Sequence, residues 1–157
     1  MSAAAAMAAM HTRLFRNCLD GLDETAARRR VNGQTNNALF LAAHLVDSRA
    51  WTARLLGLDI PEPFGGAIAY GTSIEDIPGL PELAQVRDEW SVVSALLEAR
   101  IAALTPEELA APGSHRFPIG DPTMAGALAF LLHHEAYHIG QLALLRRVNG
   151  LPAMAYR

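Results

Sequence analysis

The fold is decided by residues 121–150, which read DPTMAGALAFLLHHEAYHIGQLALLRRVNG. The opening Asp-Pro-Thr is typical of a helix start, and Gly150 is typical of a helix stop. Between them apolar residues recur at helical spacing, so one long helix is predicted, ending at Asn149. Its inward stripe carries two histidines among aliphatic side chains: Ala127, Leu131, His134, His138 and Leu145.

Three further apolar-periodic stretches precede this helix and are bounded by capping residues, Gly or Pro. No segment alternates with the period of a β-strand. The sequence therefore predicts an all-α four-helix bundle, one domain over 1–157, with sites built from facing helices. The upstream helices are expected over 3–20, from a cap at Thr35 or Asn36 to 56, and from Pro81 to 104, with a short turn at 105–109.

Residues 58–80 contain three prolines and the pair Gly65-Gly66, which predicts a long loop. Loops longer than about 12–15 residues in a compact domain are often functional. Because this loop follows the second predicted helix, we expect it to cover one mouth of the bundle.

The composition excludes several classes of function. Of the 157 residues 51% are hydrophobic and 18% charged, which rules out disorder for the body of the chain. The net charge of −3 leaves no dominant basic patch, so no nucleic-acid partner is expected. All 13 basic residues are Arg, which excludes a Schiff-base lysine and a P-loop lysine.

Cys18 is the only cysteine, so an internal disulfide and a Cys-rich zinc site are excluded. It falls on the predicted core stripe of the first helix, with Met7, Met10 and Leu14. The N-terminus lacks the charged and Leu-rich regions of a targeting segment, and no uncharged apolar run reaches about 18 residues. A cytoplasmic protein without a membrane partner is therefore expected.

The candidate site is a metal centre. His134 and His138 are about 40° apart around the helix axis and about 6 Å apart along it, which suits chelation of one ion. His44 lies on the inward stripe of the second helix, with Asn37, Phe40, Leu41, Ser48, Trp51 and Leu55. One inward histidine is usually a satisfied core residue, but three on two helices favour one divalent metal at His44, His134 and His138.

The string His134-Glu135-x-x-His138 is also that of zinc metalloproteases, in which Glu135 would be the general base. The 19 residues after His138 contain no His, Asp or Glu, and Leu144 stands where one protease class needs a third histidine. A protease is therefore disfavoured. Glu135 then lies about 80° from the metal face, either as a base at the site's edge or as a surface carboxylate.

Other polar residues each have two interpretations. Gln141 either binds water or substrate or ties down a neighbouring helix. Asp47 either orients His44 or is solvated, and Arg54 either receives an anionic group or lies on the surface. Trp51 is expected in the core and His133 on the surface, while His11 and His115 are assigned no role.

The chain resembles the DinB/YfiT-like superfamily of four-helix bundles, from about Met10 onward. The resemblance rests on Leu39-Phe40-x-x-x-His44-Leu45 with Trp51, and on His134-Glu135-x-x-His138-x-Gly140-Gln141-Leu142 followed by Leu145-Arg146 and Gly150. It implies a three-histidine metal site at His44, His134 and His138. Characterised relatives include metal-dependent transferases and isomerases that use mycothiol or bacillithiol, and others are described as hydrolases.

Three functions are consistent with these features. The leading one is a metal-dependent transferase or isomerase that uses a low-molecular-weight thiol on a small-molecule substrate. The alternatives are a hydrolase using metal-bound hydroxide and a non-enzymatic metal or small-ligand binding bundle.

Zinc is the preferred ion, with nickel or iron as alternatives. Glu135 and Gln141 are the catalytic candidates at the rim of a solvent-reaching pocket. The low charge and the apolar first helix also favour a homodimer.

Overall fold

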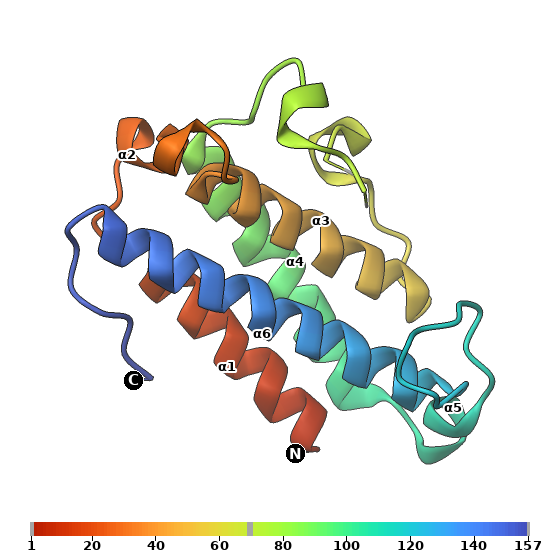
Figure 1. Ribbon diagram of the computed structural model, residues 1–157. Coiled ribbons are helices and arrows are strands. Elements are labelled where there is room, and N and C mark those ends of the chain that lie inside the picture. The colour runs from red at the N-terminus through yellow and green to blue at the C-terminus, as the bar shows by residue number, and fades with distance from the viewer. Residues whose placement is uncertain (1, 69–70, 157) are drawn as a thin grey trace.

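The computed structural model describes residues 2–68 and 71–156. In this part of the chain no strand forms, and the all-α four-helix bundle is confirmed (Figure 1). The long helices are α1 (Ala3–Leu19), α3 (Ala38–Leu55), α4 (Leu83–Ala103) and α6 (Met124–Val148). The short elements are the helices α2 (Glu24–Arg28) and α5 (Pro106–Ala110) and the 3₁₀ turns η1 (Val31–Gly33), η2 (Pro63–Gly66) and η3 (Ile74–Asp76).

The four long helices pack as a ring in which α1 and α3 each contact both α4 and α6. As Figure 1 shows, α1 and α6 run in one direction and α3 and α4 run in the other. The connection from α3 to α4 must therefore return along the length of the bundle. This topology accounts for the long loop over 58–80, whose turn η2 packs against α3.

The helix ends follow from local hydrogen bonds. Asn37 caps α3 through its side-chain oxygen, which accepts from Phe40 N at 2.8 Å. The cap was expected at Thr35 or Asn36, but Asn37 alone of the three is buried, and its amide also donates to Arg28 O at 3.0 Å. Thr123 caps α6 by accepting from Gly126 N at 3.3 Å. The four long helices begin and end within a few residues of the predicted positions.

The buried stripe of α1 differs from the predicted one. Leu14 and Cys18 are in the core as expected, but Met7 is 39% exposed. The stripe instead includes two polar residues, His11 and Thr12, which are 2% and 7% exposed. The hydropathy pattern predicts Met7 in the core, but His11 and Thr12 are buried there instead.

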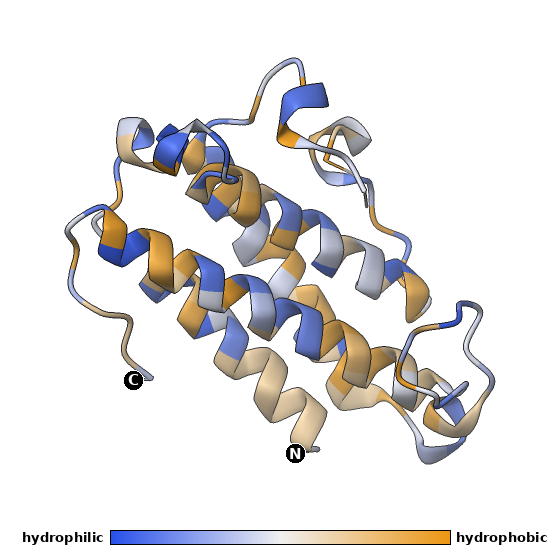
Figure 2. Cartoon of the chain, viewed as in Figure 1, coloured by the Kyte–Doolittle hydropathy of each residue, from blue (hydrophilic) through white to orange (hydrophobic). Residues whose placement is uncertain are grey.

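A hydrophilic stretch interrupts the middle of α6, which is otherwise largely hydrophobic (Figure 2). This stretch contains the polar string 133–138. Within residues 2–68 and 71–156, no helix is long and apolar enough to cross a membrane.

Two glycines of α6 allow a matched test of the packing at its start. A Cβ atom on Gly126 would lie 2.5 Å from the backbone oxygen of Asp121, whereas one on Gly140 would meet nothing within 4 Å. We expect Gly126→Ala to lower the free energy of unfolding by about 1–3 kcal/mol through overpacking. Gly140→Ala should raise it by about 0.5–1 kcal/mol through helix propensity. Chemical denaturation of both variants checks this, and equal changes in the two would contradict it.

Candidate metal centre

The structure brings the three predicted ligands together across the α3–α6 interface. His44 lies on α3, and His134 and His138 lie one turn apart on α6. The Nε2 atom of His134 is 3.3 Å from Nε2 of His44 and 3.0 Å from Nε2 of His138. One ring nitrogen of each histidine lies within 4.8 Å of the other two, and all three side chains are half-buried.

This spacing fits a tetrahedral metal ion. Two nitrogen ligands at the Zn–N distance of about 2.0–2.1 Å and the tetrahedral angle stand about 3.3 Å apart. The pairs His44–His134 and His134–His138 already have about this spacing, and the ring nitrogens of all three histidines lie within 4.8 Å of one another. Imidazole nitrogen also suits zinc, nickel and iron, so the donor set alone does not select the ion.

Contacts to the Nδ1 atoms of His138 and His134 orient these two rings so that their Nε2 atoms face the centre of the three-histidine cluster. The Nδ1 atom of His138 is 2.6 Å from Oε1 of Gln141. Because an amide oxygen only accepts, this Nδ1 carries the proton and Nε2 keeps its lone pair for a metal. The Nδ1 atom of His134 is 3.3 Å from the Ser48 hydroxyl. Such contacts to the second nitrogen fix the tautomer and the orientation of a ligand histidine.

The electrostatic environment keeps the three imidazoles neutral. Burial, followed by the charges of the neighbouring His138 and His134, lowers the pKa of His44 to about 4. Burial and then His138 likewise lower the pKa of His134 to about 4, although the charge of Glu135 acts in the opposite direction. Burial also lowers the pKa of His138, against the hydrogen bond that its ring donates to the Gln141 oxygen. At neutral pH the rings therefore carry the lone pairs that metal binding needs.

Gln141 lies at the site but is already engaged. Its oxygen faces His138, and its nitrogen donates to the Tyr137 hydroxyl at 3.3 Å. Among the described residues its hydrogen bonds stay within α6, and its role toward a substrate stays a prediction. Its contacts make it a residue that orients the ring of His138.

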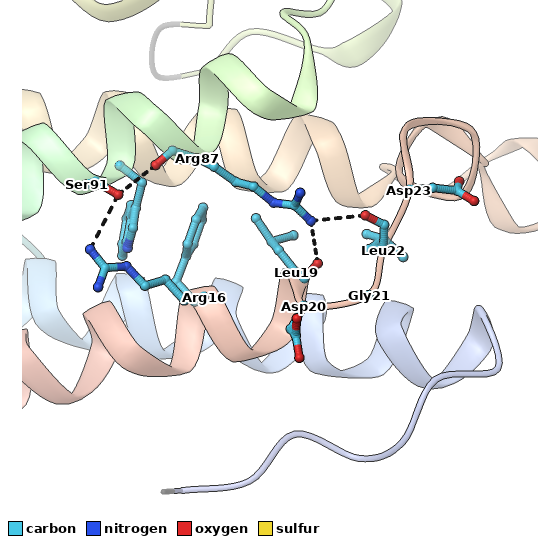
Figure 3. A pocket seen from close by; sticks show the side chains of 10 residues that line it. Arg16, Leu19, Asp20, Gly21, Leu22, Asp23, Arg87 and Ser91 are labelled. Carbon is cyan, nitrogen blue, oxygen red and sulfur yellow. Dashed lines mark hydrogen bonds between the residues drawn. The ribbon is translucent and has the colours of Figure 1, made fainter.

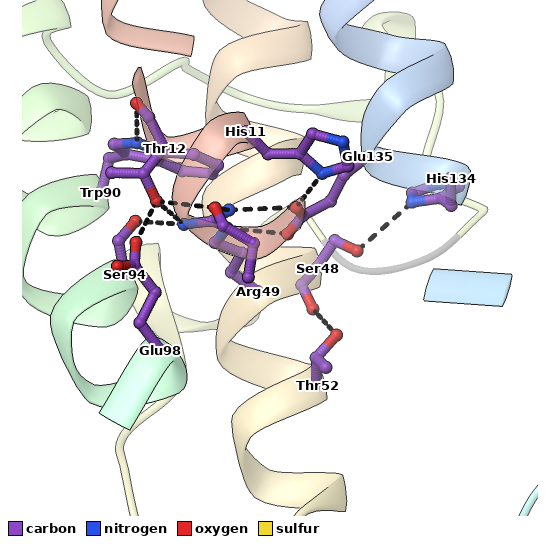
Figure 4. A network of polar contacts seen from close by, with 11 residues as sticks. His11, Thr12, Ser48, Arg49, Thr52, Trp90, Ser94, Glu98, His134 and Glu135 are labelled. Carbon is purple, nitrogen blue, oxygen red and sulfur yellow. Dashed lines mark hydrogen bonds and ion pairs between the residues drawn. The ribbon is translucent and has the colours of Figure 1, made fainter. Parts of the chain in front are cut away.

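The expected placement of Glu135 at the rim or on the surface is wrong. Glu135 is 3% exposed and points away from the metal-site face of α6. Its carboxylate pairs with the guanidinium of Arg49 at 2.7 Å and with His11 Nδ1 at 3.0 Å (Figure 4). Burial opposes its ionisation, but the charge of Arg49 and the hydrogen bonds of His11 and Arg49 outweigh burial and lower the pKa. A carboxylate held in this way is not available as a base at the metal site.

The buried partners of Glu135 were missed in the sequence. The sequence pattern predicts no role for His11, and Arg49 lies within the apolar stretch 38–56. An arginine inside an apolar helix is the signal that could have revealed the pair, because such a group needs a buried acceptor.

The other polar candidates lie outside the three-histidine cluster. Asp47 is half-buried, and no hydrogen bond joins it to His44 in the described part of the chain. Arg54 donates to Pro61 O at 3.3 Å and lies 3.7 Å from Glu62, so it holds the start of the long loop.

Trp51 is not a core residue as expected but half-buried against the segment before α6. Its ring meets His115 edge-on at 5.1 Å and Phe117 edge-on at 6.0 Å between centroids. Phe117 in turn stacks on Phe130 of α6 at 5.0 Å. His133 is exposed, as predicted.

Cys18 is buried, with its sulfur 3.3 Å from that of Met154. Burial, only partly offset by the charge of Arg146, raises the pKa of its thiol to about 11. A thiol with this pKa carries almost no thiolate at neutral pH, so Cys18 is not a nucleophile.

Two cavities of the bundle lie away from the three histidines. One, of about 550 Å³, lies between α1 and α4. Its two arginines are engaged by the protein, since Arg87 donates to the carbonyls of Leu19 and Leu22 and Arg16 donates to Ser91 (Figure 3). The other, of about 640 Å³, lies beside α2 and the end of α6. The solvent-reaching pocket expected at the histidines stays a prediction.

A model of the DinB superfamily matches residues 7–142. The chain belongs to the DinB superfamily. The match contains all three site histidines and confirms the resemblance seen in the motifs. No curated protein matches the chain in sequence.

Asp47 gives this DinB-superfamily bundle a predicted pH dependence. Burial raises the pKa of Asp47 to about 6, against Arg54 and with the help of Glu62. Because the folded-state pKa lies above the unfolded value, its contribution to stability is present at low pH and is lost as the pH rises through about 6. Asp47→Asn should therefore raise the free energy of unfolding at pH 8 by on the order of 2 kcal/mol and leave it unchanged at pH 4.

The measurement is chemical denaturation of chelator-treated protein at both pH values. Asp59→Asn is the control, because Asp59 is an exposed acid in the loop that follows α3 and should change stability little at either pH. An Asp47→Asn effect of the same size at pH 4 and pH 8 would show that burial of the charge is not its cause.

Proposed function

We propose that this protein is a metal-dependent transferase or isomerase that acts on a small-molecule substrate with a low-molecular-weight thiol. The observation that carries the proposal is the convergence of three neutral imidazoles from α3 and α6. In the described part of the chain no fourth His, Cys, Asp or Glu joins them. Three protein ligands leave one position of a tetrahedral zinc ion open, which is the arrangement of a catalytic rather than a structural site.

The chain's own residues prepare this position. Gln141 and Ser48 contact the outer nitrogens of His138 and His134 and so direct both Nε2 atoms at one point. Because the three imidazoles are neutral, they leave the charge of a bound cation uncompensated and so favour an anionic fourth ligand. A bound zinc ion would supply the positive charge that favours the thiolate form of a thiol at neutral pH.

The thiol has to come from a small molecule. Cys18 is the only cysteine, its sulfur lies in the core, and its pKa is raised to about 11. These facts favour an external thiol over an enzyme nucleophile.

A hydrolase is the second candidate, but the Glu135 carboxylate that would serve it as a base is held by Arg49 on the other side of α6.

Metal binding is tested with neighbouring histidines of α6. His134→Ala removes the central Nε2 atom and should abolish stoichiometric zinc. His133→Ala is the matched control, because this adjacent histidine is exposed and lies outside the cluster. Metal analysis of both variants after dialysis against zinc and then metal-free buffer checks this. Full zinc occupancy in the His134→Ala protein would contradict the ligand assignment.

The open position is tested by replacing the ion with cobalt. A small thiol such as cysteamine should add a sulfur-to-cobalt charge-transfer band to the spectrum. The band should persist in Cys18→Ala, because the sulfur is external, and should be absent from His134→Ala. If the thiol changes nothing and a fourth protein side chain occupies the metal, the binding-only function replaces the enzyme.

A further inference from the structure

Arg49 of α3 is fully buried, and each of its N–H groups has a partner. Its Nε and Nη2 atoms donate to the two oxygens of Glu135 at 2.7 and 3.0 Å, which makes a bidentate pair. Nη1 donates to the hydroxyls of Thr12 and Ser94, both at 2.6 Å, and Nη2 also donates to Ala8 O at 3.0 Å. These acceptors belong to α1, α4 and α6 (Figure 4).

Stability alone is a weak reason for this pair. Removing two charges from water is expensive, and replacing a buried ion pair by apolar residues of similar volume is often neutral or stabilising. A bidentate pair with saturated donors does have a property that apolar packing lacks. Its fixed hydrogen-bond directions favour one axial and rotational register between the helices that carry it.

That register is the one the metal centre needs. Arg49 directly follows Ser48 on α3, and Glu135 directly follows His134 on α6. Ser48 and His134 are themselves in contact, with 3.3 Å between Oγ and Nδ1. Adjacent residues of a helix are rigidly related, by about 100° and 1.5 Å of rise. The Arg49–Glu135 ion pair and the Ser48–His134 contact therefore join α3 and α6 at adjacent positions of the same helix–helix interface.

The carboxylate is fixed from a third direction. His11 of α1 lies 3.0 Å from the Oε2 atom of Glu135, the atom that also accepts from Arg49. The guanidinium in turn lies 4.0 Å from the centre of the Trp90 ring of α4. Glu135 thus cannot rotate or slide without breaking contacts to two other helices, and His134 is attached to the same turn.

We infer that Arg49 and Glu135 are positioning residues for the metal centre, which set α3 against α6 so that Ser48 meets His134 and the three Nε2 atoms converge. The inference rests on the proposed function for the identity of the site. It assigns the acidic residue of the His-Glu-x-x-His string a role in the register of the bundle, on the face of α6 away from the metal.

The test is the double variant Arg49→Met with Glu135→Met, which leaves no uncompensated charge in the core. Its zinc dissociation constant, measured with zinc alone against a chromophoric chelator, should rise about 10–100-fold, as for other residues that orient ligands. The d–d bands of its cobalt form should also shift. A zinc affinity within twofold of the wild type, with unchanged cobalt bands, would overturn the inference.

Arg146→Met is the matched control. Arg146 is a buried arginine like Arg49, but it belongs to α6, lies about 12 Å beyond His138 along that helix and donates to carbonyls, including Pro152 O at 2.7 Å. This variant should lose thermal stability and keep its zinc affinity. If it weakens zinc binding as much as the double variant does, the effect is general loosening of the bundle, and the inference fails.

Two further measurements cover the cases in which the double variant does not fold or the wild type binds no zinc. If the double variant does not fold, Glu135→Gln, which keeps the shape of the side chain, takes its place with the same two outcomes. If the wild type binds no zinc, the proposed function fails, and the inference is judged on metal-free crystal structures. The inference then predicts that the variant loses the contact between Ser48 Oγ and His134 Nδ1. A variant that keeps this contact would overturn the inference.

Discussion

The four long helices meet at the buried guanidinium of Arg49. From α3 it donates to Thr12 of α1, Ser94 of α4 and Glu135 of α6, so one side chain contacts all four long helices. A buried charge with an unfilled donor is costly, which means that the helices have to take the one arrangement that provides every acceptor.

Consecutive residues of α6 face two different neighbours of that helix. His134 and His138 face α3 at the metal centre, while Glu135, one residue along, faces the Arg49 junction. A turn of about 100° between neighbours makes this division possible on a helix packed on two sides. The His134-Glu135-x-x-His138 string therefore places two candidate metal ligands on one face of α6 and a buried, ion-paired carboxylate on another.

The order of the helices explains the long loop between α3 and α4. Because α3 and α4 are parallel neighbours, the chain has to return along the bundle between them (Figure 1). Arg54 at the end of α3 holds the start of this loop through Pro61. The length of the loop is thus a consequence of helix order, and it needs no function as a lid to account for it.

The sequence alone determined what depends on spacing within one helix: four long helices, the stop of the second one just before Gly57, and the histidine pair four residues apart on α6. His44 was also found, because it interrupts an apolar stripe. What only the tertiary structure decided involves residues far apart in the chain. Glu135 meets Arg49 from 86 positions away and His11 from 124, and nothing local to Glu135 separates a rim carboxylate from a buried one. Met7 and Trp51 were misplaced for the same reason, since periodicity tells which residues share a face but not which face a neighbouring helix will cover.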